Sequence, residues 1–571
     1  MPGVFVSNKI ELSIARDYPY YSYVEGSNNV DGFYVYRKVL DKFQDDKLFR
    51  ESNKLFVFTD GVCLNLQELL EKYEEEDYFS LIESLYFKEP IFPNVLRGSF
   101  SGAIYSKEER KWTFYTNHTG TKPLFYYQNG DMWIVSSSIC YIADNLKKNG
   151  IPYTLDTNSA YCLMSYGFMI GDDTLIKEVK RLKPGSIIAI DSNNKLVIKQ
   201  YYRLDNTPNY NLSPEAIMDS MDDLFTKAVK RGFLKDDEYG YEHICQLSGG
   251  LDSRYNLWVA HEKLKFKNIT AYCFSQSNTL DQKISQKIAA EVGVEYIFKN
   301  LDDALFIKDL EESIFINYGL CCSSGQLHWM RCERDFNLKI FGLRHDGILG
   351  DVIAGSYCKD DSGYNTPSTP MGNNSRYLID KTKVDFDKWD NIELFLLYNR
   401  GLNGITCSEF VRDTTSPFLD VDFINFCLSI PITIRKKGDG IYHRLLMKKY
   451  PAFCKYRWES TNSYLGASKL SIAIAKLKQF GIKYAVLKII NKVFKLHIKN
   501  DRGKNWMNPY EYWYESIEEL RTFMDSYFEN NIKLISEPEL KKDMADMYQH
   551  VSAREKIQVL TTIMAIKYYF S

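Results

Sequence analysis

The stretch "ICQLSGGLDSRYNL" (Ile244 to Leu257) places a serine, two glycines and an aspartate between a short apolar run and a segment with helical spacing. A strand that ends in a glycine turn and opens a helix presents backbone N–H groups and the positive end of the helix dipole to an anion. The hydroxyls of Ser248 and Ser253 add donors, and Asp252 supplies the hard oxygen that Mg²⁺ prefers. The sequence therefore predicts a phosphate and metal site here.

The motif differs from the two common nucleotide loops. It lacks the lysine of G-x-x-x-x-G-K-[ST] and the glycine spacing of G-x-G-x-x-G. The alternative interpretation is a serine-glycine turn that only caps a helix. The strand pattern before the motif and the helical pattern after it favour the phosphate loop.

The pattern around the loop is that of an α/β fold. Residues 206–455 alternate expected strands with expected helices, among them "HICQL", "NITAYCFS", "YIFKNL", "PEAIMDSMDDLFTKAVKRGF" and "LDQKISQKIAAEVGV". Strands that alternate with helices of this length indicate a parallel sheet.

Residues 1–205 have a different pattern, with strand-like runs separated by turns. Breaks at Asn129 and Asn193 are typical of hairpins, and Leu64 to Glu75 has helical spacing, so we expect an α+β domain with antiparallel sheets. Asn, Pro and Ser concentrate in Leu204 to Ala216, which is the best candidate for the linker between the domains. Residues 456–571 are expected to form a helical extension of the second domain.

Composition limits the possible partners. A net charge of −2 over 571 residues gives no general attraction for nucleic acid. The 12 cysteines show no zinc spacing and are expected to be reduced thiols. We find neither a signal peptide nor an apolar run of bilayer length, so a cytoplasmic protein is expected.

The motif "SGGLDS" (Ser248 to Ser253) resembles the pyrophosphate loop of ATP pyrophosphatases. Together with "AYCFSQSNTLDQKISQKIAAEVGVEYIFKNL" it is similar to the start of the synthetase domain of the asparagine synthetase family. "FGLRHDGILGDVIAGSY" (Phe341 to Tyr357) resembles the family's second phosphate loop, although Ile348 stands in the place of its glutamate. "VRDTTSPFLDVDFINFCLSIP" (Val411 to Pro431) resembles a third motif, in which Asp413 replaces a glutamate.

This resemblance implies ATP and Mg²⁺ as cofactors and assigns a site. The residues implied for ATP and pyrophosphate are Leu247, Ser248, Gly249, Gly250, Asp252, Ser253, Ser275 and Gly347. Asp252 and Asp351 are the implied magnesium ligands. The implied catalytic residues are Asp413, His443 and Arg444, and Lys437 is a further candidate for the family's charge-stabilising lysine.

The N-terminal half resembles the family's Ntn-type glutaminase domain, but its nucleophile is missing. Such enzymes use an N-terminal cysteine whose α-amine serves as the base, whereas this chain begins Met1-Pro2-Gly3. The family's oxyanion asparagine corresponds to Asp60, whose charge would oppose an oxyanion. We therefore expect an inactive glutaminase fold.

These expectations combine into a ligase that adenylates a substrate carboxylate and forms an amide with ammonia or an amine, without glutamine hydrolysis. The substrate would be a small molecule, a peptide or a sugar acid. An intramolecular cyclase of the lasso-peptide or β-lactam type, or a non-catalytic nucleotide-binding protein, stays open. The lysine-rich segment Ser468 to Lys504 is either a solvated helix or a docking surface for an acidic peptide, an anionic glycan intermediate or membrane headgroups.

Overall fold

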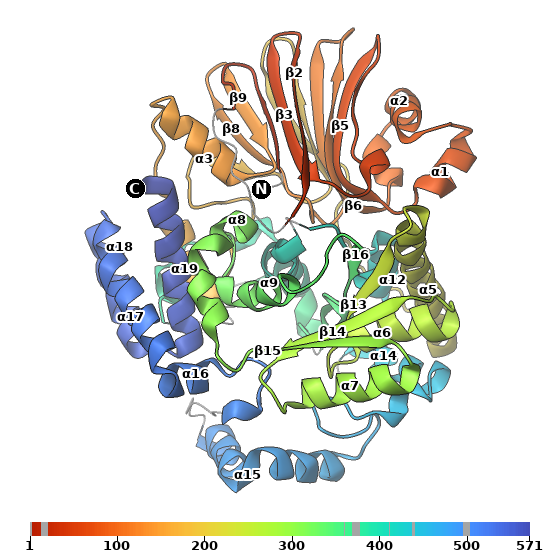
Figure 1. Ribbon diagram of the computed structural model, residues 1–571, viewed down its shortest axis with the longest axis vertical. Helices are drawn as coiled ribbons and strands as arrows, with labels where there is room; N and C mark the ends of the chain where they lie inside the picture. Colours follow the sequence, from red (N-terminus) through yellow and green to blue (C-terminus); the bar gives the residue numbers. More distant parts are fainter. Residues whose placement is uncertain are drawn as a thin grey trace.

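The fold is described from a computed structural model of the chain (Figure 1). The structure describes residues 3–12, 21–358, 360–367, 377–409, 412–436, 440–494 and 503–571. Among these residues, none of the helices combines the length and the apolar character needed to cross a membrane.

Two antiparallel six-stranded sheets form the N-terminal part, in the orders β10-β8-β9-β1-β3-β2 and β12-β11-β7-β6-β5-β4. The first sheet consists of β1 (Gly3–Ser7), β2 (Tyr23–Val30), β3 (Phe33–Leu40), β8 (Phe125–Asn129), β9 (Met132–Ser136) and β10 (Val179–Arg181). The second consists of β4 (Phe49–Glu51), β5 (Leu55–Cys63), β6 (Gly98–Ser106), β7 (Lys111–Thr116), β11 (Ser186–Ile190) and β12 (Leu196–Gln200). The hairpins predicted at Asn129 and Asn193 are confirmed as β8–β9 and β11–β12.

The two sheets pack face to face and are covered by helices on their outer faces. Alternate residues such as Val4 and Val35 of one sheet meet Phe58 and Phe114 of the other, because successive strand side chains point to opposite faces. On the outside, α1 (Leu66–Tyr73) and α2 (Tyr78–Lys88) cover one sheet, and α3 (Ile139–Lys148) and α4 (Thr157–Tyr166) cover the other. The expected helix at Leu64 to Glu75 is α1.

The second part contains the expected parallel sheet, in the order β15-β14-β13-β16-β17. Its strands are β13 (Glu242–Gln246), β14 (Ile269–Ser275), β15 (Glu295–Asn300), β16 (Phe341–His345) and β17 (Thr414–Thr415). The helices of this part are α5 (Pro214–Glu238), α6 (Asp252–Trp258), α7 (Leu280–Val292), α8 (Ile314–Asn317), α9 (Leu327–Glu333), α10 (Gly350–Ile353), α11 (Ile392–Leu396), α12 (Val421–Ser429), α13 (Ile432–Arg435) and α14 (Ile441–Lys449). Helices α5, α7, α12 and α14 share one apolar core with β13 and β14.

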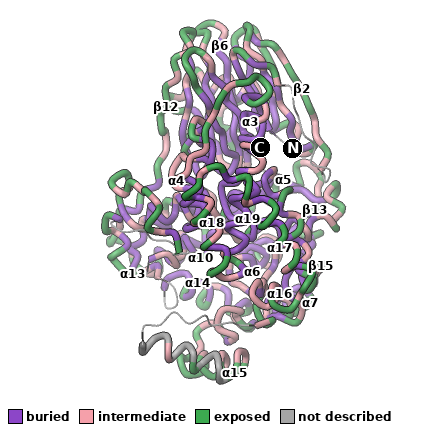
Figure 2. The backbone as a smooth tube through the Cα atoms, turned by 90° about the vertical axis from the view of Figure 1, so that its left-hand side faces the viewer, coloured by how far each residue is buried: buried purple, intermediate pink, exposed green. Residues whose placement is uncertain are grey.

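Most of the described residues from 469 to 571 are helical, in agreement with the expected helical C-terminal part. They form α15 (Lys469–Phe494), α16 (Tyr510–Ser516), α17 (Glu518–Asn531), α18 (Pro538–His550) and α19 (Ala553–Phe570). The last of these is buried along most of its length and packs against α3 and α4 of the N-terminal part (Figures 1 and 2). One apolar core therefore contains residues from Phe5 to Tyr569.

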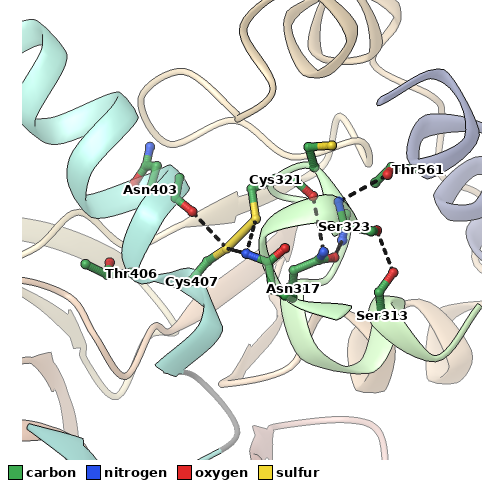
Figure 3. Close-up of a disulfide and its surroundings, with 12 residues drawn as sticks. Ser313, Asn317, Cys321, Ser323, Asn403, Thr406, Cys407 and Thr561 are labelled. Atoms are coloured by element: carbon green, nitrogen blue, oxygen red, sulfur yellow. Dashed lines mark hydrogen bonds between the residues drawn. A yellow bond between two sulfur atoms is a disulfide. The ribbon is translucent and has the colours of Figure 1, made fainter. Parts of the chain in front are cut away.

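The expectation that all cysteines are reduced is wrong for one pair. Cys321 and Cys407 form a disulfide across 86 residues of sequence, beside Ser323 and Asn317 (Figure 3). Phe168 of the N-terminal part contacts both segments. It forms a backbone bridge with Cys321, and a Cβ at Gly404, three residues before Cys407, would lie 3.2 Å from its side chain. The other ten cysteines form no disulfide, and nine of them are buried.

Candidate active site

The loop after β13 is held in place by its own hydroxyl groups. β13 is a central strand between β14 and β16. Leu247, directly after β13, continues the pairing with β14, because its N–H donates to the Tyr272 carbonyl. The Ser248 N–H then donates to Ser253 Oγ over 3.1 Å, and the Gly250 N–H donates to Ser248 Oγ over 3.1 Å. The serines therefore shape the loop before any ligand binds.

Gly249 is required by a close approach of another segment. A Cβ at this position would lie 2.7 Å from the Cβ of Glu459, whose N–H donates to the Gly249 carbonyl. The Gly249 N–H donates to Asp281 Oδ1 over 3.1 Å, and burial raises the pKa of that carboxyl. The buried guanidinium of Arg254 also donates to the Gly249 carbonyl. Glu459 and Asp281 complete the loop, although the sequence analysis did not identify either.

The second glycine-rich segment packs directly on the first. It follows β16, and a Cβ at Gly347 would lie 2.5 Å from the Ser253 nitrogen. A Cβ at Gly350 would lie 2.4 Å from Cγ of Asp252. Glycine is therefore needed at both positions, and this packing sets Asp351, on α10, beside the first loop.

Asp252 and Asp351 line one cavity of ≈ 230 Å³ at the carboxyl edge of the parallel sheet. This edge is where open α/β sheets bind their ligands. The Tyr442 hydroxyl donates to Asp252 Oδ1 over 3.0 Å, which orients the carboxylate. The residues that line the cavity are Gly250, Leu251, Asp252, Asp351, Ala354, Arg435, Lys436, Tyr442, His443, Trp458, Glu459 and Ser460.

Of the sequence-predicted residues, the cavity brings together Gly250, Asp252, Asp351 and His443. Four others, Leu247, Ser248, Gly249 and Ser253, form the loop behind the cavity wall, and Gly347 packs on that loop. Ser275 lies at the end of β14, buried, where its hydroxyl bonds with Thr279 and donates to the Gln276 carbonyl.

The candidate catalytic residues are not all at this cavity. His443 is buried on α14 with its ring edge-on to Trp458, 5.1 Å between centroids. Arg444, the next residue, is exposed and does not line the cavity. Lys437 lies outside the described residues, but its neighbour Lys436 lines the cavity.

Asp413 lies instead in a buried ion-pair cluster between the two parts of the chain. Its carboxylate contacts Lys47 Nζ at 2.6 Å and Lys122 Nζ at 3.2 Å, and both lysines belong to the N-terminal part. Burial alone would raise the pKa of Asp413, but the two lysines outweigh it and lower the pKa to about 2. Asp413 lines a separate cavity of ≈ 570 Å³, so its catalytic role stays a prediction.

Several cavity residues were missed by sequence reasoning. Arg435 is buried and paired with both carboxylate oxygens of Glu393, at 2.8 and 2.9 Å, so its charge is already neutralised. Lys436, the next residue, also lines the cavity and brings a second cationic side chain to its wall. Both residues directly precede the candidate Lys437, and the sequence alone does not show which cation of this run faces the cavity.

The expectations for the N-terminal half concern two positions. Asp60 is buried in β5, opposite Ser101 of β6. Met1 and Pro2 lie outside the described residues, so the expectation of an inactive glutaminase stays a prediction.

Comparisons with known proteins match a segment of the N-terminal part and, separately, about half of the chain. Residues 44–202 match the family described as "Glutamine amidotransferase domain". The chain is 23% identical over 274 residues to "Asparagine synthetase [glutamine-hydrolyzing] 1" of Bacillus subtilis (strain 168), an alignment that covers 46% of this chain and 42% of that protein. The chain therefore spans less than half the length of this relative.

Likenesses to solved structures are weak. One is to glutamine phosphoribosylpyrophosphate amidotransferase from B. subtilis, with 11% identity, a TM-score of 0.21 and coverage of 46% of this chain and 51% of the other. Another is to glutamine-dependent NAD+ synthetase from Acinetobacter baumannii, with 16% identity, a TM-score of 0.18 and coverage of 35% and 41%. TM-scores this low carry no functional weight. The chain is thus similar to glutamine amidotransferases in its N-terminal part and, over 46% of its length, to an asparagine synthetase.

Proposed function

We propose that this protein is an ATP-dependent ligase that adenylates a substrate carboxylate, releases pyrophosphate and forms an amide with ammonia or an amine. The observation that carries the proposal is the cavity at the carboxyl edge of the parallel sheet, where Asp252 and Asp351 lie beside the loop Ser248 to Ser253. The similarity to an asparagine synthetase supports the same reaction class.

The residues of the cavity fit a magnesium–nucleotide complex. Asp252 and Asp351 offer hard carboxylate oxygens, and the close packing of Gly350 leaves the Asp252 carboxyl in place beside the loop. These two residues would hold Mg²⁺, which neutralises phosphate charge when it is bound. The loop N–H groups already donate to Ser253, Asp281 and Ser248, so a phosphate would have to compete with these acceptors.

The remaining lining residues supply the other functions. A carboxylate resists attack by an amine, and AMP as leaving group removes that barrier. The Lys436 ammonium would stabilise the negative charge that develops during acyl transfer, and His443 lies close enough along the wall to position the substrate. The nitrogen would come from free ammonia or from a substrate amine, because Asp60 stands in the place of the glutaminase family's oxyanion asparagine and its charge would oppose an oxyanion.

The test is pyrophosphate release from MgATP in the presence of candidate carboxylates. Asp252→Asn and Asp351→Asn are each expected to lower the rate by at least about 100-fold, since each removes a charge from the proposed metal site. Asp223→Asn, on the exposed face of α5, is the matched control and should retain the rate. Unchanged release in Asp252→Asn would disprove the proposal.

The source of nitrogen and the alternatives are separated by product analysis. Ammonium should support amide formation and glutamine should not, and glutamate formed from glutamine would contradict the inactive glutaminase. A product 18 Da lighter than the substrate, formed without added amine, would identify the cyclase alternative. ATP binding measured by calorimetry without any pyrophosphate release would identify a non-catalytic binding protein.

A further inference from the structure

Helix α15 (Lys469–Phe494) lies at the end of the molecule farthest from the antiparallel sheets. In both Figure 1 and Figure 2 it projects below the body of the protein, and it consists of two helical pieces that meet at a kink at Gly481. Every residue from Lys469 to Phe480 is exposed or half-buried. Among the described residues, none of α15 belongs to a hydrophobic core.

The exposed residues of this helix include an apolar stripe. Leu470, Ile474 and Leu477 have relative exposures of 71%, 46% and 41%, and their spacing of four and three places them on one face. A helix of a globular protein normally buries such a stripe. Three large aliphatic side chains exposed on one face therefore indicate a binding partner that covers them in the complex.

The charge of α15 identifies the chemistry of that partner. The helix contains six lysines and no acidic residue, whereas the whole chain has a net charge of −2. Lys469 and Lys478 are exposed, and at 100° per residue they fall on the two opposite flanks of the apolar stripe. Long lysine side chains can keep their charge in water while their methylenes extend along an apolar layer.

We propose that α15 binds the surface of an anionic lipid membrane. Leu470, Ile474 and Leu477 enter the boundary between headgroups and acyl chains, and the flanking lysines contact the headgroups. The helical piece 469–480 before the kink carries the whole apolar stripe, and a basic residue on each side of this stripe suits a flat surface. The inference is independent of the proposed ligase activity, which lies at the sheet edge.

The binding test uses the full-length protein and sedimentation with vesicles. Vesicles of phosphatidylcholine mixed with phosphatidylglycerol should retain the protein at least tenfold better than vesicles of phosphatidylcholine alone. Because salt screens contacts between charges, 0.5 M NaCl, which reduces the Debye length to about 4 Å, should reduce this preference several-fold. Equal or absent binding to the two vesicles would overturn the proposal.

Two sets of variants test the residues. Leu470→Glu with Ile474→Glu should reduce binding at least tenfold, while Val197→Glu, at a site on β12 with 51% exposure, should not. The substituted side chains contribute to no core, so the fold should be retained, and circular dichroism checks this.

The second set alters charge alone. Lys469→Glu with Lys478→Glu should reduce binding to anionic vesicles, and Lys148→Glu, an exposed position on α3, should not. Wild-type binding by either α15 variant would refute the assignment. Concentration-dependent self-association that Leu470→Glu abolishes would show that a second copy of the chain covers this face, and would also refute it. Pyrophosphate release should be unchanged in all of these variants.

Discussion

The cluster of Asp413, Lys47 and Lys122 makes a prediction that separates a structural role from a catalytic one. Asp413→Asn keeps the shape of the side chain and removes its charge. The side chains of Lys47 and Lys122 are 0% and 3% exposed, so both would lose the charge of this carboxylate in a buried environment. We expect the variant to be strongly destabilised at pH 7.

The magnitude follows from the surroundings of the carboxylate. A pKa lowered from 3.8 to about 2 corresponds to about 2.4 kcal/mol at about 1.36 kcal/mol per pKa unit. Removing one partner of a buried pair costs about 3–5 kcal/mol, because the charge that remains is uncompensated. We therefore expect the free energy of unfolding to fall by about 2–5 kcal/mol.

The pH dependence has a defined sign. The pKa of Asp413 is lower in the folded protein than in the unfolded chain, so its contribution is present above the unfolded pKa of about 4 and lost as the pH falls through about 2. The difference in stability between wild type and Asp413→Asn should thus be largest near neutral pH and should shrink below pH 4.

The assay is urea unfolding followed by tryptophan fluorescence, at pH 7 and at steps down to pH 2.5. Asp45→Asn, an exposed acid in the same N-terminal region, is the control and should unfold like wild type. Replacing Asp413, Lys47 and Lys122 together by Leu, Met and Met should recover most of the lost stability. A variant Asp413→Asn with wild-type stability but no pyrophosphate release would refute this reasoning and establish the catalytic role.

Three further predictions concern the site and its neighbourhood. Gly350→Ala should reduce pyrophosphate release at least tenfold, because the added Cβ would displace the carboxylate of Asp252. Gly325→Ala is the control and should leave the rate unchanged, because a Cβ there would have no other atom within 4 Å. Lys436→Met should lower the ligase rate at least tenfold and Arg444→Met should leave it unchanged, since of these two residues Lys436 lines the cavity and Arg444 does not. Burial lowers the pKa of Lys42 to about 7, so between pH 7 and 10.5 the unfolded chain binds one proton more than the folded protein. The free energy of unfolding of the wild type, measured by urea titration, should therefore rise relative to that of Lys42→Met as the pH is raised through this range.

The parts of the fold that depend on local pattern could be predicted from the sequence. Alternation of apolar residues around Asn129 and Asn193 predicted two hairpins, and the helix–strand alternation after Pro214 predicted the parallel sheet. Asp252 could be proposed from the glycine turn between an expected strand and an expected helix, and Asp351 from the resemblance of its segment to the family's second phosphate loop.

Contacts between distant segments could not be predicted in the same way. Asp281 and Glu459 reach the loop from other elements. Asp281 lies in a quoted family segment and Glu459 lies outside all of them, but no local pattern shows that either residue contacts the loop. The placement of Asp413 beside Lys47 depends on how the two parts of the chain pack, which no local pattern encodes. The disulfide between Cys321 and Cys407 has the same origin.

Helix α19 has a consequence for the order in which the molecule can mature during synthesis. The Tyr569 hydroxyl lies 3.9 Å from the sulfur of Cys140 on α3, and these residues are 429 positions apart in the chain. The apolar surface of α3 and α4 that α19 covers therefore remains exposed until the ribosome has made α19. Contacts of such long range close slowly, and the waiting surface is exposed to aggregation. The N-terminal part is therefore expected to need a chaperone that shields this surface from aggregation until translation is complete.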